Sequence, residues 1–342
     1  MARGSLWQEE KTQMISDAHL DLGLDLLRCR RAGQPHVLRD YYIPRWRAAG
    51  VGLIVAAVYL EDQSSDEAYR REALAQLDAL EYALAETEGA VLCTTGAELD
   101  RARQQGRTAL LLSLEGAEPI GADPGALEEF YARGVRLLGL CWSRENRAGF
   151  GGGYEPDGGT DGRGLKSLGK ELVRRAGRLG MLVDVSHLND GGCADVADLS
   201  ERPFFASHSN ARALRPMDRN LSDRTIASIA AAGGMVGVNG YSGLVAGTTQ
   251  TATLSALADH TDYLRERLGA QRLGLGLDLM ERISAQGETF TSGGVTMDAF
   301  DILRDHSAVP GFLRELARRG YSPQEQAGIA GENWFSFFRT WL

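Results

Sequence analysis

The sequence predicts an α/β fold in which eight parallel strands alternate with helices and close into a (β/α)8 TIM barrel. Three observations support this prediction. Short, continuous apolar runs recur along the whole chain, and segments with helical spacing of apolar residues lie between them. In addition, histidine or carboxylate side chains follow several of the runs directly. Continuous apolar runs of this length are typical of strands that are buried on both faces.

The eight apolar runs are the predicted strands. Their parallel arrangement follows from the helical segments that separate them, because a parallel pair needs a long crossover connection. In chain order the predicted strands cover residues 14–18, 52–59, 109–114, 135–141, 181–186, 203–207, 235–239 and 273–277.

The predicted helices are identified by apolar side chains three and four residues apart and by residues that favour helix starts. Ser65 precedes the first of them and Ser222 precedes the third. We see no linker, so residues 1–342 are expected to form one barrel domain. The predicted helices cover residues 66–84, 165–179, 223–232, 254–268 and 311–319, and a last segment runs from Ser322 and Pro323 to Trp341.

Composition excludes several classes of protein. The net charge of −9 argues against a nucleic-acid-binding protein, which usually has a basic face. No apolar stretch approaches the roughly 18 residues that span a bilayer, and the N-terminal residues lack the apolar core of a signal peptide. The four cysteines form no C-x-x-C pair and are expected to be reduced. We therefore expect a cytoplasmic protein that binds neither nucleic acid nor membrane.

A glycine-rich stretch, residues 149–164, follows the fourth predicted strand. It lacks the G-K-[ST] ending of a phosphate-binding loop, which argues against a nucleotide site. Two interpretations remain open, an active-site loop on the catalytic face of the barrel and a surface insertion.

Polar side chains suited to a metal stand at the ends of five predicted strands. The carboxyl ends of barrel strands share one rim, so these side chains are expected to converge there. Residues two apart on an extended chain point to the same side, so His19 and Asp21 can bind one ion together. The expected set comprises His19, Asp21, Glu115, His187, His208 and Asp278.

Six such groups are too many for one tetrahedral zinc. They suit two divalent cations that share a bridging carboxylate and a water whose pKa falls from 15.7 towards roughly 7. Asp278 would accept the proton of this water and return it to the leaving group. The other three histidines, His36, His260 and His306, lack the pattern and are expected to be structural or exposed.

Several segments resemble one known family. The sequence D-A-H-L-D at residues 17–21 is similar to the D-G-H-N-D opening of the membrane (renal) dipeptidase family, metallopeptidase family M19. The resemblance covers nearly the whole chain, with a metal-dependent hydrolase barrel as the implied fold. Further matching segments are S-L-E-G at 113–116, F-Y-A-R-G-V-R at 130–136, M-L-V-D-V-S-H at 181–187, S-H-S-N-A-R at 207–212, R-N-L at 219–221, L-G-L-D at 275–278 and G-E-N-W-F at 331–335.

The resemblance implies a role for each residue. Arg219 would pair with the free carboxylate of a dipeptide, a bidentate task that suits a guanidinium group. A hydroxide bridging the two metals would attack the peptide bond, and Asp278 would be the proton shuttle. His19 and Asp21 would bind one zinc, His187 and His208 the other, and Glu115 would bridge the two.

The chain departs from the family pattern in two places. The family often carries a histidine where this chain has Trp142, and Trp can donate a hydrogen bond but cannot carry charge. Met280 and Glu281 follow the catalytic aspartate in place of the family's D-G. Both changes concern the substrate pocket, to which we assign Trp142, Asn239 and Tyr241 together with Arg219.

The sequence therefore predicts a dipeptidase that uses two Zn²⁺ ions, although other divalent transition metals fit the same ligands. L-Xaa-D-Xaa dipeptides are among the candidate substrates, and a homodimer is expected from the resemblance. Two alternatives remain open. One is a binuclear amidohydrolase that acts on an N-acyl amino acid or a lactam, and the other is a metal-binding homologue whose activity has decayed.

Overall fold

The structure is a computed structural model that describes residues 13–154, 162–280, 282, 291–292, 295–296 and 300–342. Its main sheet is parallel and curls into a ring. The hydrogen-bonded order is β6-β5-β4-β2-β1-β8-β7, and β3 (Ala90–Leu92) pairs with β4 outside this path. The strands of the path are β1 (Ile15–Leu20), β2 (Val51–Val58), β4 (Thr108–Glu115), β5 (Val135–Gly139), β6 (Leu182–Asp184), β7 (Val236–Val238) and β8 (Leu273–Leu275).

The sixth apolar run closes the ring. Phe205 pairs with Asp184 of β6 and Ala206 pairs with Val236 of β7, both in parallel. These two bridges supply the missing connection between the ends of the path, which confirms the predicted (β/α)8 barrel. Phe205 and Ala206 are the paired residues of this run, so the strand predicted over 203–207 is longer than the observed one.

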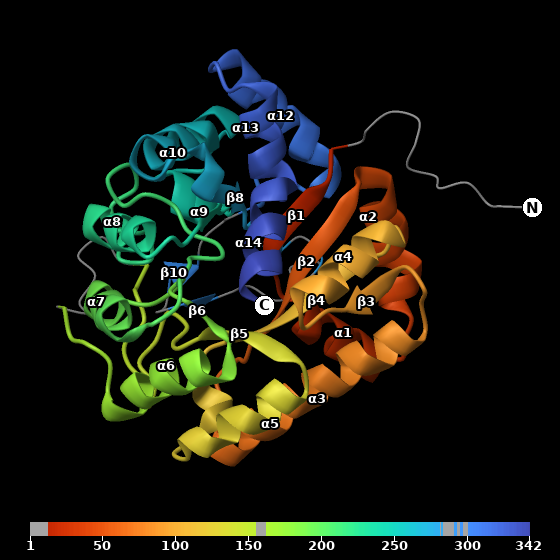
Figure 1. The fold of residues 1–342 in the computed structure, drawn as a ribbon, viewed down its shortest axis with the longest axis vertical. Helices are drawn as coiled ribbons and strands as arrows, with labels where there is room; N and C mark the ends of the chain where they lie inside the picture. Colours follow the sequence, from red (N-terminus) through yellow and green to blue (C-terminus); the bar gives the residue numbers. More distant parts are fainter. Residues whose placement is uncertain (1–12, 155–161, 281, 283–290, 293–294, 297–299) are drawn as a thin grey trace, which may run out of the picture.

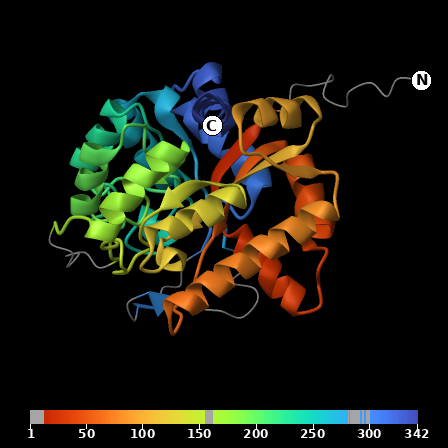
Figure 2. The same ribbon diagram turned by 60° about the horizontal axis from the view of Figure 1, so that its bottom comes forward.

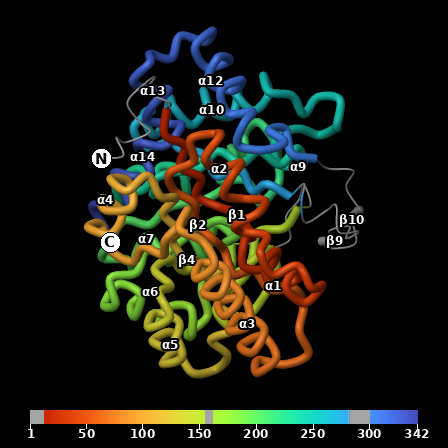
Figure 3. Tube along the Cα trace, turned by 90° about the vertical axis from the view of Figure 1, so that its right-hand side faces the viewer, coloured from red at the N-terminus to blue at the C-terminus, as the bar shows by residue number. Residues whose placement is uncertain are grey.

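Helices surround the ring of strands (Figure 1), and Figures 2 and 3 show the long helix α3 at the outer surface beside α1. Apolar faces of these helices cover the outside of the sheet. The helices are α1 (Leu22–Arg31), α2 (Ile43–Ala49), α3 (Asp66–Ala85), α4 (Gly96–Gln104), α5 (Leu127–Ala132), α6 (Ser167–Leu179), α7 (Asp190–Leu199), α8 (Asp223–Ala231), α9 (Ser242–Val245), α10 (Leu254–Leu268), α12 (Val309–Arg318), α13 (Pro323–Ala327) and α14 (Asn333–Trp341).

The predicted helix starts are confirmed by their caps. The side chain of Ser65 accepts a hydrogen bond from the Ala68 backbone, and Ser222 does the same for Thr225. The sequence prediction missed β3, the short hairpin β9 (Thr291–Ser292) and β10 (Val295–Thr296), and several helices, among them α1, α4 and α7. These elements are short, so their periodicity is weak.

The last predicted helix is interrupted. A π-helical segment, Gly328–Glu332, separates α13 from α14. Gly331 lies against the start of β1, where a Cβ atom would come within 2.4 Å of the Met14 carbonyl oxygen. Only glycine fits this approach, so the π-helical segment can pack directly against the start of β1.

The interior of the barrel follows the two-residue repeat of buried strands. In β2, Leu53 and Val55 point into the ring, whereas Ile54 and Ala56 belong to the layer between strands and helices. Side chains fill the ring, so the barrel is a packed core rather than a pore.

Helix α14 closes the end of the barrel where the strands begin, and it crosses the middle of the ring in Figure 1. Its Trp334 and Phe338 rings are stacked at 5.2 Å and pack on Phe205. The Trp334 indole donates to the Leu275 carbonyl at 2.9 Å. Because α14 covers this end of the barrel, a functional site is expected at the opposite rim, where the strands end.

All four cysteines are buried, and no disulfide joins any two of them. No helix in the described part of the chain combines the length and the apolar character needed to cross a bilayer.

Candidate metal centre

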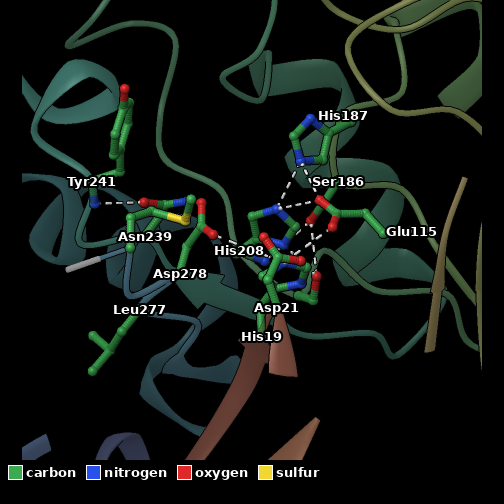
Figure 4. A network of polar contacts seen from close by, with 12 residues as sticks. His19, Asp21, Glu115, Ser186, His187, His208, Asn239, Tyr241, Leu277 and Asp278 are labelled. Atoms are coloured by element: carbon green, nitrogen blue, oxygen red, sulfur yellow. Dashed lines mark hydrogen bonds and ion pairs between the residues drawn. The ribbon is translucent and has the colours of Figure 1, made fainter. Parts of the chain in front are cut away.

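Six polar side chains from five strand ends converge at the carboxyl rim of the barrel (Figure 4). They are the six that the sequence predicts. His19 and Asp21 lie at the end of β1, Glu115 ends β4, and Asp278 lies beyond β8. His187 follows β6, and His208 follows the segment that closes the ring.

The carboxylate of Glu115 divides the cluster into two lobes. Its Oε2 lies 3.4 Å from Nε2 of His19, which is also 3.7 Å from Asp21 Oδ1 and 3.8 Å from Asp278 Oδ1. We call this group, comprising His19, Asp21, Asp278 and Glu115 Oε2, the acidic lobe.

The other oxygen of Glu115 faces two histidines. Its Oε1 lies 2.9 Å from Nε2 of His187 and 3.6 Å from Nε2 of His208, and the two Nε2 atoms are 2.8 Å apart. We call His187, His208 and Glu115 Oε1 the histidine lobe. One carboxylate thus reaches both groups, which is the arrangement expected of a bridging ligand.

The backbone is strained at two of these positions. His187 has φ 65° and Asp278 has φ 57°, and they are the only non-glycine residues of the described chain with positive φ. The left-handed region costs such residues energy, and strain of this kind concentrates at functional sites. Next to Asp278, a Cβ atom on Gly276 would meet the Ser207 carbonyl oxygen at 1.8 Å, so glycine is required there.

A buried relay orients His208. Its Nδ1 lies 2.6 Å from the hydroxyl of Ser207, and that hydroxyl also contacts a carboxylate oxygen of Asp184. Because the hydroxyl donates to the carboxylate, it accepts from Nδ1–H of the histidine. The lone pair of His208 is therefore on Nε2, the atom that faces the cluster, as is usual for a metal ligand.

Ser143 orients His187 in the same way. Its hydroxyl lies 2.8 Å from His187 Nδ1, while the guanidinium of Arg219 donates to Nε2 at 3.0 Å. Nε2 is therefore the acceptor and Nδ1 carries the proton. Neither serine was predicted from the sequence, although Ser207 directly precedes a predicted ligand.

A third buried contact ties two strand ends together. Asp17 accepts hydrogen bonds from the backbone of His19 at 3.3 Å and of Leu277 at 2.9 Å, and its other oxygen contacts Nε2 of His306 at 2.9 Å. Asp17 thereby links the segments that carry His19 and Asp278. The expectation that His306 has a structural role agrees with this contact, and His260 contacts the backbone groups of Ala211 and Val245.

Burial and crowding perturb the acid–base chemistry of the acidic lobe. Burial raises the pKa of Glu115 to about 8, although His19 opposes this shift. Burial, reinforced by Asp21, also raises the pKa of Asp278. For His19, burial alone would lower the pKa, but Glu115, Asp21 and Asp278 together raise it well above its usual value. The lobe therefore attracts positive charge strongly.

The histidine lobe behaves in the opposite way. Burial lowers the pKa of His187 well below its usual value, and Arg219 and His19 lower it further. Burial, and after it the charges of His19 and Arg219, also lower the pKa of His208 well below its usual value. Both imidazoles are therefore neutral near pH 7 and keep lone pairs that a metal can use.

The residues fit a pair of cations. Three buried atoms that point into the cluster, Nε2 of His19, Oδ1 of Asp21 and Oε2 of Glu115, have no hydrogen-bond partner among the described residues. In the other lobe, Nε2 of His187 and Nε2 of His208 lie 2.8 Å apart, and both are acceptors, so neither can donate to the other. Unpartnered buried polar atoms are costly, and a cation in each lobe would satisfy them.

Arg219 is buried beside the histidine lobe. It is 2% exposed, and besides its contact with His187 it donates to the His208 carbonyl at 3.0 Å and to the Ser209 hydroxyl at 3.2 Å. Its Nε has no partner among the described residues. The guanidinium therefore lies next to the cluster with one donor uncommitted.

The remaining predicted pocket residues lie around the cluster. The Trp142 ring is 5.5 Å from the His187 ring and 5.4 Å from that of Tyr59. Asn239 is buried, donates to Asp278 Oδ2 at 3.2 Å, and accepts from the Tyr241 backbone at 2.7 Å.

Two parts of the sequence prediction fall partly beyond the described chain. Glu281 and residues 155–161 of the glycine-rich stretch lie outside the described residues. On its described side, this stretch adjoins the cluster, since Gly152 donates to the His187 carbonyl and Gly153 accepts from the Arg219 backbone.

Known proteins are similar to this chain in sequence and in fold. A family model described as membrane dipeptidase (peptidase family M19) matches residues 9–341. An uncharacterized protein from the pqqA 5′ region of Klebsiella pneumoniae is 33% identical over 270 residues, which cover 78% of this chain and 94% of that protein.

Two crystal structures are similar over almost their whole length. One is the dipeptidase AC, a metallopeptidase of family M19, with a TM-score of 0.82, 29% identity, and coverage of 96% of this chain and 99% of that one. The other is a metallopeptidase from Rhodobacter sphaeroides liganded with a phosphinate mimic of the dipeptide L-Ala-D-Ala, with a TM-score of 0.81, 28% identity, and coverage of 97% and 100%.

Proposed function

Because the chain belongs to the membrane dipeptidase family, peptidase family M19, and is a metallopeptidase that acts on dipeptides, we propose that two divalent cations at the barrel rim serve this hydrolysis. Zinc is the proposed native metal, since imidazole and carboxylate ligands suit it. The observation that carries the proposal is the division of the Glu115 carboxylate between two lobes, with 3.4 Å to His19 and 2.9 Å to His187.

Each lobe would hold one cation. His19 and Asp21 would bind the first, His187 and His208 the second, and Glu115 would contact both. Bound there, two divalent cations would lower the pKa of a water that they share and would polarise the carbonyl of the scissile peptide bond.

Asp278 would move the proton. As the water oxygen bonds to the carbonyl carbon, a carboxylate oxygen of Asp278 would accept the proton that the water loses. It would pass this proton to the amine nitrogen as the C–N bond breaks. A raised pKa suits a group that must both take and give a proton, and Asn239 holds the carboxylate through Oδ2.

Arg219 would select dipeptides by their length. Its guanidinium is buried beside the histidine lobe and has an uncommitted Nε donor. A dipeptide places its free carboxylate one residue beyond the scissile bond, within reach of a group at this distance from the cluster. A longer peptide has an amide there and would leave the guanidinium without a charged partner.

The test is a substrate panel on protein of measured metal content. It contains dipeptides with L or D residues at each position, tripeptides, N-acyl amino acids and lactams. We expect hydrolysis of dipeptides, with L-Xaa-D-Xaa members among the substrates because the Rhodobacter sphaeroides relative binds a mimic of one. Hydrolysis of N-acyl amino acids or lactams without dipeptides would overturn the proposal, and so would a fully metal-loaded protein that hydrolyses nothing.

Replacing Arg219 by alanine tests the carboxylate contact. We expect KM for dipeptides to rise more than kcat falls, because the guanidinium contributes binding that is common to the ground state and the transition state. The measurement is steady-state kinetics on Arg219→Ala, with Arg215→Ala as control because Arg215 lies on the same segment and contacts the Gly243 carbonyl instead. An unchanged KM would refute the contact.

A further inference from the structure

The two lobes differ in charge although they share one carboxylate. The acidic lobe has the carboxylates of Asp21 and Asp278 in addition to Glu115 Oε2. The histidine lobe has two neutral imidazoles and Glu115 Oε1. Cation affinity rises with the negative charge around a site, and the acidic lobe adds the ligand Asp21 and the nearby carboxylate of Asp278, so on this count alone it is the stronger site.

Arg219 increases this difference. Its Nη2 atom lies 3.0 Å from His187 Nε2, the atom that would ligate the cation of the histidine lobe. Hydrogen bonds to the His208 carbonyl and the Ser209 hydroxyl hold the guanidinium in place. At 2% exposure the charge is poorly screened by salt, so it repels a cation in this lobe.

We propose that Arg219 makes the histidine lobe the weaker of the two cation sites, and that the carboxylate of a bound dipeptide strengthens this site by neutralising the guanidinium. The second half of this proposal rests on the proposed function, because it takes Arg219 as the carboxylate contact. By linkage, a dipeptide and the second cation then bind cooperatively, each increasing the affinity for the other by the same factor. The enzyme would complete its metal pair most readily when a substrate of the correct length is present.

The first experiment contains no dipeptide. Metal-depleted full-length protein is titrated with Zn²⁺ in competition with a chelator, and two binding steps of unequal affinity are expected. Arg219→Gln should tighten the second step about tenfold, the scale expected when a unit charge is removed from a poorly screened site, and should change the first step less than twofold. Arg215→Gln, which removes the same charge from the same segment, should change neither step.

Three further variants assign the steps and guard against misfolding. His208→Gln should retain the tight step and lose the weak one, whereas Asp21→Asn should weaken the tight step. Arg219→Lys keeps a positive charge near the lobe and should leave the second step weak. An Arg219→Gln protein whose second step is unchanged or weaker would overturn the proposal, and so would a second step that tightens equally in the lysine variant.

The second experiment tests the linkage. In the Asp278→Asn protein, which is expected to lose most turnover, the Zn²⁺ titration is repeated with saturating L-Ala-D-Ala and with its C-terminal amide. The dipeptide should tighten the second step about tenfold and the amide should not. If both tighten it equally, the carboxylate is not the cause and the linkage is wrong. A failure of dipeptidase activity would leave the first titration readable, so the two proposals can fail separately.

Discussion

Asp278→Asn is expected to remove most turnover while both cations stay bound. Asparagine keeps the shape of the side chain and its contact with Asn239, but it cannot accept a proton from the attacking water. General acid–base catalysis contributes about 10²–10⁴-fold to a rate, so kcat should fall by that factor. The measurements are kcat on a good dipeptide and the bound metal per chain.

The control for this variant is Asp301→Asn. Asp301 accepts a hydrogen bond from the Met280 backbone and supports the same stretch of chain without being part of the cluster. Asp301→Asn should therefore lower stability without a comparable loss of kcat. A near-normal rate in Asp278→Asn would refute the role of Asp278 as the proton shuttle, and a loss of metal would mean that Asp278 acts mainly as a ligand.

Glu115→Gln is expected to lose metal as well as turnover. The substitution removes the one charge that both lobes share, and a neutral amide cannot bridge two cations as a carboxylate does. Changes to residues that only support a ligand already cost 10–100-fold in metal affinity, so loss of the bridging ligand should cost more than about 100-fold. Metal per chain, measured after equilibration with a chelator of known affinity, should fall below that of the wild type.

In the metal-free protein, Glu115→Gln is not expected to lower stability. Burial raises the pKa of Glu115 to about 8, so the folded chain binds a proton there more readily than the unfolded chain does. The stability of the metal-free protein should thus decline as pH rises from the ordinary glutamate range towards 8. Glutamine removes this loss, so at pH 8 the metal-free Tm of Glu115→Gln should be at least as high as that of the wild type.

Glu118→Gln is the matched control for Glu115→Gln. Glu118 lies three residues further along and pairs with Arg144 at 3.0 Å rather than with a residue of either lobe. It should lose stability and keep its metal. If Glu115→Gln retains two cations at wild-type affinity, the bridge is wrong, even if activity is lost.

The ligands could be predicted from the sequence because barrel topology brings distant residues to one rim. A histidine or carboxylate directly after a buried strand has little choice of position once the strands are parallel and adjacent. His187 and His208 illustrate this, since each follows a short apolar run and their Nε2 atoms lie 2.8 Å apart. The helix starts at Ser65 and Ser222 were predictable because capping is a local interaction.

The groups that orient the ligands were not predictable in the same way. Asp17 and His306 are separated by 289 residues and meet only because β1 and the segment after β8 are neighbours in the closed barrel. The hydroxyl of Ser143, which follows β5, reaches His187, which follows the neighbouring strand β6. Such contacts depend on side-chain directions in three dimensions, for which a single sequence carries no periodic signal. The close approach of Gly331 to the start of β1 is likewise a contact between distant segments.

The position of the cations is the most direct test of this account. Crystals of the zinc-loaded protein, with anomalous diffraction recorded on both sides of the zinc absorption edge, should show two peaks. One peak should lie between His19, Asp21 and one oxygen of Glu115, and the other between His187, His208 and the second oxygen. A single peak, or peaks that leave Glu115 uncoordinated, would contradict the account.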